Sequence, residues 1–197
     1  MSDGIFAIAI TLLVLTISEP DDYSHLASQL AHRWPSLAAY VVSFAIIGIM
    51  WFNHHSVFGY LETIDAGFFY LNLFLLMTIA FLPYPTGVLG KALLHGDGAR
   101  TAAVVYSVTM AINAVAWSAL WIYASSNRRL LKSTFPESQR RTATLAFTLG
   151  GVVYAVSIGI AFINAYACLA FHAVLAVYYA FDPISRRAKR QVTATTN

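Results

Sequence analysis

Five long segments without a charged residue constrain the fold of this 197-residue chain more than any other feature. They cover residues 4–18, 34–61, 66–90, 101–127 and 142–181. A helix that crosses a bilayer needs roughly 20 predominantly apolar residues. The three middle segments therefore predict one membrane-spanning helix each, and the last is long enough for two. The first segment predicts one further, shorter helix.

The composition also indicates a membrane protein. Charged residues make up 11% of the chain and apolar residues 58%, whereas soluble domains average about 25% and about 45–50%. So few charges cannot cover the surface of an ordinary soluble enzyme, and an aromatic content of 14% excludes a disordered chain. The segments are apolar on every face, which favours helices over the alternating strands of a β-barrel. We therefore predict an all-α, polytopic membrane protein with six transmembrane helices per subunit.

Local signals set the expected helix boundaries. Asn164, with Gly159 nearby, marks a break between the last two helices. Pro83 and Pro85 are expected to end the third helix, because the second proline removes another backbone donor. The six expected helices are about 4–18, 36–58, 66–88, 100–125, 142–161 and 165–181.

Basic residues outside the expected helices predict the orientation. With both termini in the cytoplasm, nine of the twelve lysine and arginine residues lie on the inner side, as the positive-inside rule requires. These nine are Arg128, Arg129, Lys132, Arg140, Arg141, Arg186, Arg187, Lys189 and Arg190. We therefore predict a cell-membrane protein with a transmembrane domain at 1–182 and a basic cytoplasmic tail at 183–197. Membrane lipid is its expected surroundings, and a net charge of +3 does not indicate a nucleic-acid partner.

Polar side chains inside the spans need partners, because a bilayer offers no water to satisfy them. Ser2 and Asp3 open the first helix, while Asn53, His54 and His55 lie near the end of the second. We expect an interhelical hydrogen-bond network that joins Asp3 to the histidines. A metal site is not favoured, because adjacent helical residues point about 100° apart and no HExxH pattern occurs. The chain also lacks GxSxG and phosphate-binding glycine motifs, so we expect neither an enzyme nor a cofactor.

The first helix carries a stripe of branched aliphatic residues. Ile8, Leu12 and Leu15 share one face through spacings of four and three, and Thr11 lies beside them. This stripe has two interpretations. It is a packing or lipid-facing surface, or it lines a pore formed by repeated copies of the helix, where aliphatic rings block ions by dewetting.

Three ordered motifs carry a family resemblance. They are Ser-Asp-Gly-Ile-Phe-Ala-Ile-Ala-Ile-Thr-Leu-Leu-Val-Leu-Thr-Ile at 2–17, Trp-Phe-Asn-His-His at 51–55 and Phe-Leu-Pro-Tyr-Pro-Thr at 81–86. Together they resemble the transmembrane protein 175 family, the endolysosomal potassium channels and their prokaryotic relatives. The family opens with Arg-x-x-x-Phe-Ser-Asp. Met1 stands at the position of its phenylalanine, and the arginine four positions earlier has no counterpart here.

The resemblance implies a potassium-permeable channel without a TVGYG filter, and no such motif occurs in this chain. It implies a homotetramer of six-helix subunits in which the first helix lines a central pore with modest potassium selectivity. By position, Ile8 forms the narrow constriction, Leu12 and Leu15 form further rings, and Thr11 supplies a ring of hydroxyl groups.

The resemblance also assigns the polar group a role. Ser2, Asp3, Trp51 and one of the two histidines, His54 or His55, belong to the network that fixes the first helix against the second, and we include Asn53. The alternative is a secondary transporter or proton-coupled exchanger that uses the group of Asp3, His54 and His55 as a proton relay. A membrane-embedded metal-dependent enzyme and a non-conducting scaffold are two further alternatives.

Overall fold

The structure is a computed structural model that describes residues 1–20, 23–126, 129–133 and 135–181. The regular elements in these ranges are all helices, so the all-α prediction is confirmed there, and the tail predicted at 183–197 lies outside the described residues. In chain order the elements are α1 (Ser2–Leu12), η1 (Leu13–Thr16), α2 (Leu26–His32), α3 (Trp34–Gly59), α4 (Ala66–Phe81), α5 (Pro83–His95), α6 (Ala99–Ser126), α7 (Glu137–Ile163) and α8 (Ala165–Phe181).

Four helical stretches of the described chain are long and apolar enough to cross a membrane. They are Trp34–Gly59, Ala66–His95, Ala99–Ser126 and Arg140–Ile163. The segment Ser2–Thr16 and helix α8 are apolar but shorter. Four of the expected spans therefore have the length of a full crossing, and the first and last are the short members of the bundle.

The third expected helix ends at the prolines, earlier than the expected residue 88, and a further helix that was not predicted follows at once. Helix α4 ends at Phe81, α5 begins directly at Pro83, and the chain stays helical to His95. Both prolines fall in the first turn of α5, whose backbone N–H groups have no partner within a helix in any case. Leu82 between the two helices keeps right-handed helical angles. The chain therefore starts a new helix at the prolines and stays helical across them.

The predicted break at Asn164 is confirmed. Its backbone is extended, with φ −153° and ψ 123°, and it separates α7 from α8. The side-chain Oδ1 of Asn164 accepts a hydrogen bond of 3.0 Å from the backbone N–H of Ala167. This bond caps the first turn of α8, as asparagine does at many helix starts.

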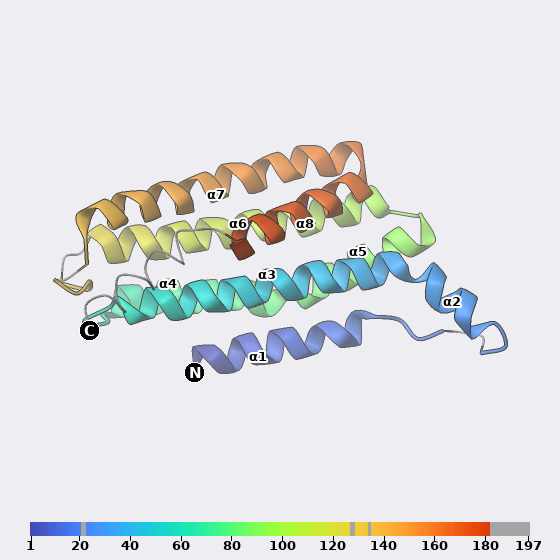
Figure 1. Cartoon of the computed structure of the whole chain (residues 1–197), viewed down its shortest axis with the longest axis horizontal. Coiled ribbons are helices and arrows are strands. Elements are labelled where there is room, and N and C mark those ends of the chain that lie inside the picture. Colours follow the sequence, from blue (N-terminus) through green and yellow to red (C-terminus); the bar gives the residue numbers. More distant parts are fainter. Residues whose placement is uncertain (21–22, 127–128, 134, 182–197) are drawn as a thin grey trace.

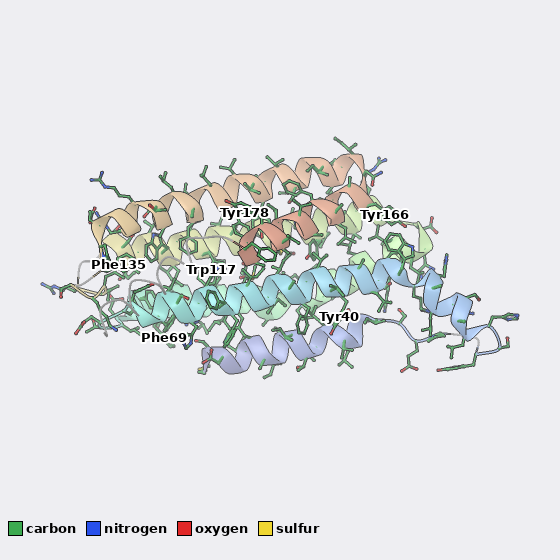
Figure 2. All side chains as sticks on the ribbon, viewed as in Figure 1. Tyr40, Phe69, Trp117, Phe135, Tyr166 and Tyr178 are labelled. Atoms are coloured by element: carbon green, nitrogen blue, oxygen red, sulfur yellow. The ribbon has the colours of Figure 1, made fainter. Side chains whose placement is uncertain are left out.

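The helices form one elongated bundle (Figure 1). Helix α1 runs along one edge and α7 along the opposite edge, with α3 between them. Helix α1 packs against α3 and α4, and η1 packs against α5. Side chains fill the space between the helices, as the buried Trp117 of α6 does, while many apolar side chains point outward from the bundle (Figure 2). Exposed apolar surface of this kind is expected where lipid or another subunit replaces water.

Candidate functional site

Helix α1 has one face in the bundle and one face outside it. Phe6, Ala9 and Leu13 are buried and follow each other at spacings of three and four residues. On the other face, Ile8 is 60% exposed, Leu12 43% and Leu15 77%. The stripe singled out in the sequence is therefore the uncovered side of the helix, and the packing side is a different set of residues.

Thr11 also lies on the exposed face. Its Oγ1 donates a hydrogen bond of 2.9 Å to the backbone carbonyl of Ile8. The donor of the hydroxyl is thus used within the helix, while the oxygen keeps acceptor capacity toward the exposed side. Thr11 can therefore offer an oxygen, but not a free N–H or O–H, to a partner outside the chain.

Asp3 is held by Trp51. The indole Nε1 of Trp51 on α3 donates a hydrogen bond of 2.9 Å to Oδ1 of Asp3, and both side chains are exposed. The ring of His55 lies beside that of Trp51, with centroids 6.1 Å apart. Asp3, Trp51 and His55 therefore share the outward side of the contact between α1 and α3, and Ser2 is half-buried at the helix start.

His54 points the opposite way, into the bundle. Its side chain is buried, and its Nε2 lies 2.8 Å from Oδ1 of Asn72 on α4. Because an amide oxygen only accepts, the ring N–H of His54 donates in this bond. The edge of the Phe6 ring meets the His54 ring at a centroid distance of 5.3 Å, and Phe58 stacks on it at 4.2 Å.

The expected hydrogen bond between Asp3 and a histidine is not formed in the described structure. Asp3 bonds Trp51 instead, and His54 bonds Asn72. The physical reason is the 100° step between helical neighbours, which turns His54 inward and leaves Trp51 and His55 outward. Asn53, next to them, is half-buried. What links His54 to α1 is the aromatic contact with Phe6.

Two residues of this arrangement were not assigned a role from the sequence. Asn72 is an isolated amide in an apolar segment, and that isolation was the available signal for a buried partner. Phe6 gave no signal, since it is one apolar residue among many. Among the described residues, no three His, Cys, Asp or Glu side chains gather into a group able to hold a metal ion.

Comparison with known proteins gives matches along most of the chain. The family model described as endosomal/lysosomal potassium channel TMEM175 matches residues 1–83. A potassium channel from Streptomyces collinus is 43% identical over 93% of this chain and 90% of its own length. The human endosomal/lysosomal proton channel TMEM175 is 36% identical over 42% of this chain and 18% of its own length.

A solved structure has the same arrangement of helices. It is the crystal structure of a lysosomal potassium-selective channel TMEM175 homolog from Chamaesiphon minutus. That structure superposes with a TM-score of 0.82 at 38% identity, and the match covers 91% of this chain and 92% of the other. The similarity thus extends beyond the three motifs to the whole bundle.

Proposed function

This chain belongs to the TMEM175 family of potassium channels, and from that membership we propose that it is a potassium-selective cation channel that conducts K⁺ passively across the membrane. The family consists of ion channels rather than enzymes and uses no cofactor. K⁺ is the permeant ion, since the matching relatives are named potassium channels. The strongest support is the near full-length match to a bacterial relative named a potassium channel. The uncovered stripe of α1 adds support from the chain itself.

The proposed pore lies along the exposed face of α1. A homotetramer with α1 next to the central axis brings four copies of Ile8, Leu12 and Leu15 together as successive rings. Rings of branched aliphatic side chains exclude water and therefore ions when they are narrow. Ile8 is the proposed constriction and gate, and the Thr11 oxygens form a polar ring one turn away.

The proposed transmembrane domain includes six spans in residues 1–182. The segment α1–η1 has eleven α-helical and four 3-10 residues, which reach about 24 Å. Helix α8, with 17 residues, reaches about 26 Å. Both lengths approach the hydrocarbon thickness of about 30 Å. The positive-inside rule supports cytoplasmic termini in the cell membrane, with the tail at 183–197 on that side.

The polar group is proposed to hold α1 in register against α3. The Asp3–Trp51 hydrogen bond fixes the start of α1, and the Phe6–His54 contact fixes it one turn later. Ser2, Asn53 and His55 complete the surroundings of these two contacts. A pore helix with an uncovered face needs such attachments, because lipid offers no hydrophobic drive for helix association.

Substitution at the proposed constriction tests the pore. Ile8→Asn places a polar side chain on the ring, so we expect a higher K⁺ flux and weaker discrimination against Na⁺ in liposomes containing the purified protein. The matched control is Val156→Asn, since Val156 is 53% exposed. It belongs to α7, which runs along the edge of the bundle opposite α1 (Figure 1). Equal fluxes and equal ion preference in wild type and Ile8→Asn would refute Ile8 as the gate.

The contacts of the polar group speak against a proton-coupled exchanger. A relay needs hydrogen bonds that run from one titratable group to the next. In the described structure Asp3 bonds Trp51 and His54 bonds Asn72, so two of the three proposed relay groups bond non-titrating partners instead of each other. Single-channel recording separates the two functions, since an exchanger gives no unitary current steps.

A further inference from the structure

The segment η1, which continues α1, lies so close to α5 that a side chain at the contact point would require a shift of a few tenths of an ångström. At Gly87 on α5, an added Cβ would lie 3.0 Å from Cβ and 3.3 Å from Cγ2 of Thr16 in η1. Ordinary van der Waals contacts of a Cβ begin at about 3.4 Å. The absence of a side chain at Gly87 therefore determines how closely η1 can pack against α5.

We propose that Gly87 is a positioning residue that fixes the width of the pore at Leu15, by letting Thr16 rest against α5. The inference rests on the proposed function, since it takes the exposed face of α1 as the pore wall. Leu15 precedes Thr16 in the chain and is 77% exposed. A displacement of Thr16 therefore moves Leu15 with it.

Helix α5 is not the partner that yields, because hydrogen bonds tie it to α3 on both sides of Gly87. Oγ1 of the buried Thr86 donates to Oγ of Ser43 at 2.9 Å, and Oγ of Ser36 donates to the carbonyl of Gly90 at 2.9 Å. A Cβ at Gly90 would also lie 3.1 Å from Cα of Ser36, so the two helices are already in close contact.

The segment η1 is the freer side of this contact. Leu13 is buried and holds the start of η1, whereas Val14 and Leu15 beyond it are exposed. The hydroxyl of Thr16 donates its hydrogen bond within η1, to the carbonyl of Leu13, so in the described structure this bond does not tie Thr16 to α5. A side chain at position 87 therefore pushes Thr16 away from α5 and toward the exposed face. In the proposed tetramer that movement brings the Leu15 side chains closer to the axis and narrows their ring.

The test compares two glycines of different surroundings. Gly87→Ala and Gly87→Val should lower K⁺ flux in liposomes progressively, with Val reducing it by about threefold or more as the aliphatic ring narrows. Gly151→Ala and Gly151→Val on α7 are the matched controls, because a Cβ there meets nothing within 4 Å. Both pairs share the gain in helix propensity from replacing glycine.

A second substitution separates positioning from misfolding. Thr16→Gly removes Cβ and Cγ2, the two atoms closer than ordinary van der Waals contact, and leaves only Cα at 3.7 Å. Thr16→Gly combined with Gly87→Ala should therefore restore flux relative to Gly87→Ala alone. Leu15→Cys in a Cys168→Ser background should form crosslinks between subunits faster when Gly87 is replaced by Val. A merely destabilised protein would show neither the rescue nor the faster crosslinking.

The outcomes distinguish this inference from the proposed function. If Ile8→Asn changes flux but the Gly87 variants conduct and crosslink like their Gly151 controls, Gly87 does not position the pore and the inference is wrong. If the wild type itself conducts no K⁺, the proposed function fails and takes the inference with it. Reduced flux without rescue by Thr16→Gly also contradicts the inference.

Discussion

The hydrogen bond between His54 and Asn72 holds the imidazole ring that contacts Phe6 of α1, and its contribution to stability can be measured. The bond is 2.8 Å long and joins two buried side chains of α3 and α4. Asn72→Leu removes the amide at similar volume and leaves the imidazole N–H of His54 without its acceptor. His54→Phe keeps the aromatic contacts with Phe6 and Phe58 and removes the donor.

Two estimates of the magnitude compete. In water-soluble proteins, a buried group left without its partner costs about 1–3 kcal/mol. Between membrane helices, double-mutant cycles average only about 0.6 kcal/mol with a maximum of about 1.7 kcal/mol, because the unfolded state in the membrane also finds partners. Since α3 and α4 are both apolar spans, we expect a coupling energy of about 0.6–1.7 kcal/mol.

The assay is a double-mutant cycle on unfolding in bicelles, with wild type, Asn72→Leu, His54→Phe and the double variant. The double variant should be more stable than the sum of the single effects predicts, because neither partner is then left unpaired. Asn53→Leu paired with His54→Phe is the control, since Asn53 lies outside this bond. A coupling energy indistinguishable from that control would refute a stabilising role for the bond.

Two further substitutions follow from the packing. Trp51→Phe removes the 2.9 Å bond to Asp3 and should lower stability in bicelles by about 0.6 kcal/mol; an unchanged free energy of unfolding would show that this bond does not fix α1. Gly67→Ala places a Cβ against the Tyr123 ring and should cost about 1–3 kcal/mol through overpacking. Because Tyr123→Ala also removes the hydrogen bond from Tyr123 to Asp65, the test is whether Gly67→Ala costs less in the Tyr123→Ala background than in the wild type in a thermal-unfolding experiment. An equal cost in both backgrounds would place the strain elsewhere.

The sequence predicted four of the six expected spans at full crossing length, because length and apolarity are local properties. The charge-free segments correspond to α3, α4 with α5, α6, and the pair α7 and α8. Asn164 could be predicted as a break because asparagine is a common cap residue, and here its side chain caps the start of α8. The helix that follows the prolines could not be predicted, because a proline that ends one helix can also occupy the first turn of the next. Pro83 does so.

The site was harder to predict, because its contacts join residues that are distant in the sequence. Periodicity grouped Ile8, Leu12 and Leu15 on one face but could not tell whether that face was covered. The partner of His54 is Asn72 on another helix, and no spacing rule links the two. The close approach of Gly87 to Thr16 depends on the path of two helices and has no sequence signal at all.

The most direct test of the proposed function is single-channel recording of the purified chain in a planar bilayer with K⁺ on one side and Na⁺ on the other. We predict unitary current steps with a reversal potential that is shifted from zero toward the value of a potassium-selective pore. In the Ile8→Asn variant we predict larger steps and a reversal potential closer to zero, because a polar ring no longer dewets. Transport without unitary steps, or a reversal potential at zero for the wild type, would contradict a potassium-selective channel.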